Sequence, residues 1–245
     1  MIGWVHVSID LPADRDHGPA RFWAAALGWP LGEPWSQWPE FSSFTPEHGD
    51  SYVHRQLVGG DPRVHPDLEV DDPESTEQRL VDLGASPVRA TDSWRTLTSP
   101  GGLPFCLVRT ADHDHRPAPI GAPGARSRLV QISIDAPAAL RDREVEFWRA
   151  ATGWRFASGD RPEFAGKLYP EPGSSIQFLL QRLDPDDPGT EVRAHIDLGC
   201  DDREAEAHRL VALGAERLWD GDGWITLRDP AGLLFCATGN SPDAP

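Results

Sequence analysis

Tryptophan and histidine supply most of the side chains that could do chemistry in this chain, which holds 10 Trp and 9 His among 245 residues. Trp35 and Trp38 lie close together in the Pro-flanked stretch GEPWSQWPEF. Aromatic rings in a loop can stack on a flat organic ligand at the mouth of a cleft. The same rings could instead seal a contact between two domains, and the sequence leaves both alternatives open.

Other reactive side chains give weaker indications. The chain has 3 Cys, an odd and small number that argues against a disulfide framework and favours reduced, buried thiols. His113 and His115 lie in a stretch rich in Pro, Gly and Ala, where we expect them to be solvated. No G-x-S-x-G motif, P-loop or dinucleotide-binding glycine fingerprint is present, so the corresponding chemistries have no support.

The charge balance limits the partners. Lys and Arg number 23 against 39 Asp and Glu, which gives a net charge of −16 and a pI near 4.8. Nucleic acids and anionic membranes attract basic surfaces, so neither is expected as a partner. No apolar run approaches the roughly 18 residues of a membrane helix. The opening MIGWVHVSID lacks the features of a signal peptide. We therefore expect an acidic, cytoplasmic protein.

The sequence contains two copies of one unit. VHVSID at 5–10 returns as VQISID at 130–135, and LVDLGA at 80–85 returns as LVALGA at 210–215. WRTLTSPGGLPFC at 94–106 returns as WITLRDPAGLLFC at 224–236, with 8 of 13 positions identical. Trp23 and Trp148 are among the tryptophans that recur, so we expect them to be framework. A duplication decides the fold before any single motif does.

Within each copy, strand and helix patterns alternate as β-α-β-β-β written twice. We therefore expect both copies to form the same unit of eight strands and two helices. In the first copy, strands are predicted at 4–9, 41–44, 51–58, 65–70, 88–91, 94–98 and 105–109, and helices at 18–27 and 73–83. We predict domains at 1–110 and 128–240, a Pro/Gly/Ala-rich linker at 111–127 and a loose tail at 241–245.

Together, the helix ending in LGW, the H-x-D-L strand, the helix ending in LGA and the final hairpin ending in F-C resemble the vicinal oxygen chelate superfamily. The resemblance covers both copies and is closest to the glyoxalase-like and bleomycin-resistance-like domains. It implies an α+β fold of tandem domains, each with two βαβββ modules that form an open, barrel-like cleft. Members include lyases, isomerases, ring-cleaving dioxygenases and proteins that only bind antibiotics, so the fold alone does not settle the chemistry.

The resemblance also implies positions for metal ligands. The first-strand position matches His6 in copy one, and the fifth-strand position matches His65. His54 is the best match on the fourth strand, and Cys106 stands where relatives have Glu. Three imidazoles and a thiolate suit one divalent metal, Zn, Fe, Mn or Ni, in domain 1. The alternative is that the thiol and the histidine are structural, because free Cys is often buried.

The second copy offers a poorer set of ligands. Its matching residues are Gln131, Gln177, His195 and Cys236. We therefore expect the protein to bind a small organic molecule in the cleft of one domain, the first, with Trp35, Trp38, His6, His54 and His65 as ligand-binding residues. The alternative is a lyase, isomerase or oxygenase with a metal in domain 1. Either a monomer, as an internal pseudo-dimer, or a homodimer agrees with the duplication.

Overall fold

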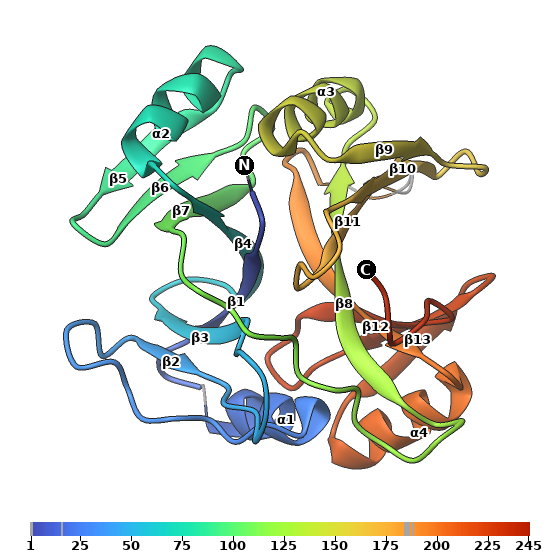
Figure 1. Ribbon diagram of the computed structural model, residues 1–245. Coiled ribbons are helices and arrows are strands. Elements are labelled where there is room, and N and C mark those ends of the chain that lie inside the picture. Colours follow the sequence, from blue (N-terminus) through green and yellow to red (C-terminus); the bar gives the residue numbers. More distant parts are fainter. Residues whose placement is uncertain (1, 16, 184–186, 188) are drawn as a thin grey trace.

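The computed structural model describes residues 2–15, 17–183, 187 and 189–245, which fold as two similar halves (Figure 1). The first half contains β1 (Val5–Pro12), α1 (His17–Leu27), β2 (Phe41–Ser43), β3 (Val53–Val58), β4 (Arg63–Val70), α2 (Pro73–Asp82), β5 (Ser86–Ala90), β6 (Trp94–Thr98) and β7 (Pro104–Arg109). The second half contains β8 (Ser127–Ala136), α3 (Arg141–Thr152), β9 (Arg155–Ser158), β10 (Phe164–Tyr169), β11 (Gln177–Arg182), β12 (Arg193–Cys200), α4 (Arg203–Leu213), β13 (Glu216–Asp220), β14 (Trp224–Arg228) and β15 (Leu234–Thr238). The α+β tandem duplication expected from the sequence is confirmed.

Each half is built on one mixed sheet that stays open. The described strands of the first sheet follow the order β2-β3-β1-β4-β7-β6-β5, and those of the second follow β13-β14-β15-β12-β8-β11-β10-β9. In both sheets the first strands of the two modules pair antiparallel at the centre, as β1 with β4 and β8 with β12. The modules therefore meet along the middle of each sheet, and their remaining strands extend to either side.

The prediction of eight strands in each copy is wrong for the first half, where seven strands are described. In the second half, β9 follows α3 directly, whereas the matching residues of the first half form only the isolated bridge between Leu31 and Phe44. Pro30 and Pro34 flank this segment. Proline has no N–H to donate to a sheet ladder, which explains why a full strand does not form there.

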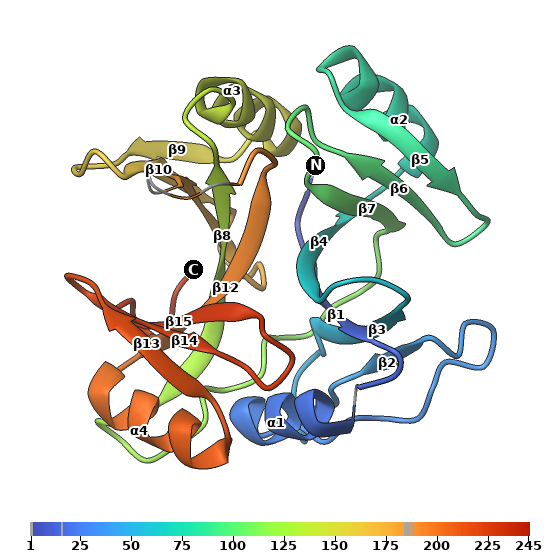
Figure 2. The same cartoon turned by 180° about the vertical axis from the view of Figure 1, so that it is seen from behind.

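A shared core lies between the two halves, with β4 close to β12 and helices of both halves at its ends (Figure 2). Trp23 and Trp148 are fully buried there, as expected for framework residues. The Trp23 indole donates to the Asp229 carboxylate across the interface at 2.8 Å. Arg209 of α4 donates to the last carbonyls of α1, and Arg79 of α2 does the same for α3. These caps satisfy carbonyls that a helix end leaves unpaired.

We call the face of each sheet that is turned away from the other half its outer face. Residues 110–119 continue from β7 without regular structure. The C-terminal residues are not loose: Arg116 donates to the Ala244 carbonyl at 2.7 Å, and Arg126 pairs with Asp243 at 3.0 Å. None of the helices in the described ranges is long and apolar enough to cross a membrane.

Candidate metal centre

The alternation of side chains along β1 and β4 places a dense set of polar groups on the outer face of the first sheet. Val5, Val7 and similar residues turn inward to the core, so their neighbours turn outward. Across the central strand pair, His6 lies opposite Asp67, and Ser8 lies opposite His65. The β-strand period therefore turns two short sequence motifs into one polar surface.

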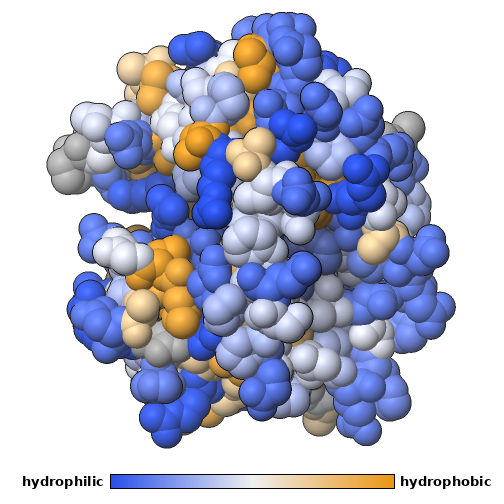
Figure 3. Space-filling view, turned by 90° about the vertical axis from the view of Figure 1, so that its left-hand side faces the viewer, coloured by the Kyte–Doolittle hydropathy of each residue, from blue (hydrophilic) through white to orange (hydrophobic). Residues whose placement is uncertain are grey.

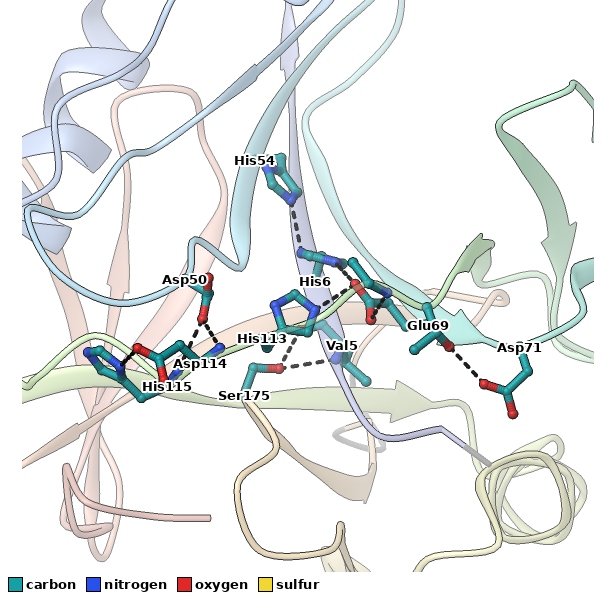
Figure 4. A network of polar contacts seen from close by, with 12 residues as sticks. Val5, His6, Asp50, His54, Glu69, Asp71, His113, Asp114, His115 and Ser175 are labelled. Carbon is teal, nitrogen blue, oxygen red and sulfur yellow. Dashed lines mark hydrogen bonds and ion pairs between the residues drawn. The ribbon is translucent and has the colours of Figure 1, made fainter.

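Two histidines and a carboxylate converge at one end of this surface (Figure 4). His6 Nε2 lies 2.8 Å from Glu69 Oε1, and His113 Nε2 lies 2.9 Å from the same oxygen. Burial alone would raise the pKa of Glu69, but hydrogen bonds from His6, His113 and the Ala111 backbone hold it below its usual value. The carboxylate is therefore ionised and faces two imidazole nitrogens.

His113 reaches this place because its segment is held, in contrast to the solvated linker that the sequence predicted. Its ring stacks on Trp4 with centroids 4.0 Å apart and planes within 10°. Asp50 accepts hydrogen bonds from the backbone N–H groups of Asp114 and His115 at 2.7 and 3.1 Å. The His115 side chain pairs with its exposed neighbour Asp114 and does not reach the site. The linker therefore contributes one histidine to the site.

His54 lies behind His6 and does not point at the carboxylate (Figure 4). Its Nε2 is 3.0 Å from His6 Nδ1, and its Nδ1 is 3.0 Å from Ser43 Oγ. Burial, followed by the proximity of His6, lowers the pKa of His54 to about 3. A neutral His54 carries one ring N–H and one acceptor nitrogen, so it can hold the orientation of the His6 ring.

His65 and Cys106 belong to a second cluster, so the four ligands expected in the first copy are divided between two places. The His65 imidazole lies between carboxylates, with Asp10 at 3.2 Å and Asp67 at 3.3 Å. Burial opposes its charge, yet the two carboxylates raise the pKa of His65 well above its usual value. Burial also raises the pKa of the Cys106 thiol. His65, Asp67 and Cys106 therefore form a group of their own, with ligand atoms within 4.8 Å of one another, apart from His6 and Glu69.

The second half repeats the second cluster only. His195, Asp197 and Cys236 converge as His65, Asp67 and Cys106 do. Where the first half has His6, the second has Gln131, which donates to Asp197. Gln177 donates to Gln131 at 3.0 Å, so it contacts the first-strand side chain much as His54 does. Among the described residues, the site with two histidines and a carboxylate occurs in the first half alone.

Aromatic rings adjoin the site in the first half. Trp35 stacks on Phe41 at 5.2 Å and meets the edge of His54 at 5.4 Å. Trp38 packs against Trp94 at 4.6 Å. We call these four rings, Trp35, Trp38, Phe41 and Trp94, the aromatic wall. Their ring contacts lie within the first half, whose side of the molecule is otherwise largely hydrophilic (Figure 3). The alternative that Trp35 and Trp38 seal the contact between halves therefore finds no support in their ring contacts.

The donors present fit a divalent metal. The ligand atoms of His6, Glu69 and His113 lie within 4.8 Å of one another. Two imidazoles with one carboxylate are a donor set that binds Fe²⁺ and Zn²⁺ in other proteins. His6 is among the ligands expected from the sequence, whereas Glu69 and His113 are not. Glu69 was detectable, because it shares a strand face with His65 and Asp67 and becomes Gly199 in the second copy.

Comparisons with known proteins agree with the fold. The profile of the glyoxalase-like domain matches residues 6–108 and again 131–238. A Mn(II)-bound glyoxalase from Novosphingobium aromaticivorans has 18% identity and a TM-score of 0.65, over 98% of this chain and 82% of its own. A mutant of 4-hydroxymandelate synthase from Streptomyces coelicolor has 17% identity and a TM-score of 0.62, over 98% and 94%. A mutant of homoprotocatechuate 2,3-dioxygenase from Brevibacterium fuscum has 11% identity and a TM-score of 0.64, over 100% and 75%. A search of curated protein sequences finds no match.

Proposed function

The chain belongs to the glyoxalase-like domain family of the vicinal oxygen chelate superfamily, and from that premise we propose that its first half is a divalent-metal centre that binds and activates a small organic molecule. The second half is the scaffold that completes the shared core. The observation that carries this proposal is the convergence of His6, Glu69 and His113 on the outer face of the first sheet. The structural similarity to a Mn(II)-bound glyoxalase supports the same direction.

His6, Glu69 and His113 would hold the metal. A bound divalent ion would act as a Lewis acid toward an oxygen atom of the ligand. For this, His6 Nε2 must lose its proton and keep one on Nδ1, which faces His54 Nε2 at 3.0 Å. His54, neutral because its pKa is about 3, can accept that hydrogen bond and pass its own N–H to Ser43. The protein therefore supplies a partner for either tautomer of His6.

The aromatic wall defines the kind of molecule that the site would accept. Trp35 adjoins His54 and stacks on Phe41, so a ligand at the metal centre would have apolar rings on one side and polar groups on the other. Ligand sites in proteins combine a mainly apolar lining with a few placed polar groups in this way. We therefore propose a small, flat organic molecule with an oxygen donor, as the substrate or ligand.

The decisive test is the metal content of the purified full-length chain. Elemental analysis after dialysis should give about one divalent ion per chain in the wild type. His6→Ala and Glu69→Gln should each remove it, because the first deletes an imidazole nitrogen and the second replaces the charged carboxylate with a weaker, neutral amide oxygen. His113→Ala should do the same, whereas the matched variant His115→Ala should keep the metal. Retention of the ion in both His6→Ala and Glu69→Gln would contradict the proposed centre.

A further inference from the structure

The guanidinium of Arg89, at the edge of the first sheet, is a cation without an acidic partner. Its guanidinium lies over two rings of the aromatic wall, 5.8 Å from the centroid of Trp38 and 5.8 Å from that of Trp94. The side chain is exposed, and among the described residues no carboxylate lies within ion-pair distance of it. By contrast Arg95, on the neighbouring strand, is paired with Glu77 at 3.2 Å.

A second unpaired donor lies beside this guanidinium. The indole Nε1 of Trp38 is buried and has no hydrogen-bond partner in the described structure. A buried N–H without an acceptor destabilises the folded state, so such groups are normally matched. An indole N–H can only donate, and a guanidinium can only donate as well. What both groups lack is an acceptor.

The matching place in the second half is built differently. Alignment of WPEF with RPEF puts Arg161 at the place of Trp38, and the 130-residue offset puts Trp219 at the place of Arg89. Arg161 is neutralised there, because it donates to the carboxylate and to the backbone carbonyl of Asp222, each at 2.8 Å. The unpaired donors are therefore particular to the half that carries the candidate metal centre.

We propose that Arg89 and the Trp38 indole form an anion-recognising subsite, and that the ligand of the first half is a flat molecule with a carboxylate group. This inference rests on the proposed function, since it places the subsite at the far end of the same ligand. A carboxylate offers the acceptors that both donors lack, and charge-assisted hydrogen bonds are the stronger kind. The aromatic wall would contact the planar body between the carboxylate and the metal.

Sheet register gives the size of the ligand. Trp94 pairs with Val108 on β7, and the parallel neighbour of Val108 on β4 is Glu69. Two strand spacings separate Trp94 from Glu69, which is about 10 Å. Arg89 itself is on β5, one strand beyond Trp94, but its guanidinium reaches back over the Trp94 ring. A molecule between the metal centre and this guanidinium would therefore have about the length of two fused rings with one substituent. Smaller acids would engage only one end of the site.

The test compares 2-naphthoate with its neutral analogue 2-naphthamide, by isothermal titration calorimetry on the full chain. The wild type should bind 2-naphthoate at least tenfold more tightly than the amide. Arg89→Gln should remove this preference, because it deletes the cation and keeps a polar side chain of similar length. Arg89→Lys should keep part of it. The matched control Arg95→Gln should leave the preference unchanged, because Arg95 is already paired with Glu77.

A nitrogen-15 spectrum gives an independent readout. The indole N–H resonance of Trp38, assigned by its loss in Trp38→Phe, should shift downfield with 2-naphthoate and stay in place with the amide. Equal affinity for the two probes, failure of 2-naphthoate to bind, or a preference that survives Arg89→Gln would overturn the subsite. Repeating the titration with His113→Ala separates the two proposals. Failure of the metal centre alone leaves the Arg89-dependent preference measurable, whereas a preference that depends on metal and not on Arg89 contradicts the subsite.

Discussion

In the first half, the Glu69 side chain extends from β4 toward His6 and His113, whereas the matching residue of the second half is Gly199. A Cβ atom on Gly199 would lie 2.8 Å from the Ser241 carbonyl oxygen and 3.0 Å from that of Asn240. The backbone that follows the last strand therefore occupies, in the second half, the place where the first half has its carboxylate. The segment after the last strand therefore decides whether a half can form the site. In the first half it supplies His113, and in the second half it leaves no room for a side chain at position 199.

The features that both halves share indicate which residues serve the fold. Each has an imidazole held between two carboxylates beside a buried thiol. Features kept in both copies serve the fold that both copies need. The residues that differ, Glu69 and Arg89 among them, are the better candidates for function.

The largest expected effect concerns the core that the two halves share. Trp23→Ala should lower the free energy of unfolding by about 3–5 kcal/mol, as large core truncations do. The ring is fully buried, and its indole N–H donates a hydrogen bond to Asp229. Trp148→Ala should have a similar effect if the two ends of the interface are equivalent. Urea denaturation measures both. The exposed Trp219 gives the control, and Trp219→Ala should change stability by less than about 0.5 kcal/mol.

The next effect tests why the second half lacks the carboxylate. Gly199→Ala should destabilise the protein by about 1–3 kcal/mol, the usual cost of overpacking, since the new methyl group meets backbone carbonyls. Gly59→Ala is the matched control, because an added Cβ there meets nothing within 4 Å. Thermal denaturation of both variants decides the point. An unchanged Gly199→Ala variant would show that the C-terminal segment moves aside easily.

A smaller effect is expected at the aromatic wall. Trp35→Ala should weaken the binding of 2-naphthoate about tenfold, or about 1.4 kcal/mol, while the melting temperature changes little, because the side chain is 37% exposed. Calorimetric titration beside a thermal melt measures the two quantities together. A large fall in melting temperature with unchanged affinity would identify Trp35 as packing and remove it from the ligand site.

The last effect concerns the imidazole that both halves share. Burial opposes the charge on His195, but Asp135 and Asp197 raise its pKa well above the usual value. A raised pKa in the folded state stabilises the protein fully below about pH 6.5, and this contribution is lost as the pH rises through the folded-state pKa. Stability should therefore decline on the alkaline side of neutrality. Urea titrations at several pH values should show a weaker decline in His195→Gln, and an identical decline in both proteins would exclude this histidine as the cause.

Much of the fold could be predicted from the sequence, because the duplication and the strand alternation are local patterns. The strand at Trp94–Thr98 was predicted with its observed bounds. The missing strand after α1 was not, although Pro30 and Pro34 gave the signal in single residues. Hydrophobic periodicity indicates which side of a helix or strand is apolar. It does not indicate whether a segment will pair with neighbouring strands of the sheet.

The candidate site was harder to predict, because it depends on contacts between distant segments. His6 was identified from its strand position, but its ring faces Glu69 and His54 and not His65. His113 lies in a segment whose composition is typical of a solvated linker, and contacts with distant residues, the stacking on Trp4 and the hydrogen bonds to Asp50, fix it in place. Local sequence patterns do not predict that a loop will pack against a distant strand. A comparison of the two copies would have singled out Glu69.

The central claim is that one metal centre exists, in the first half, and that the linker histidine completes it. Titration of the metal-free full chain with Co²⁺, followed by the visible absorption of the bound ion, tests this most directly. We predict saturation at one equivalent in the wild type and in His195→Ala, and no absorption change in His113→Ala. Saturation at two equivalents, or one equivalent that persists in His113→Ala and disappears in His195→Ala, would contradict this claim.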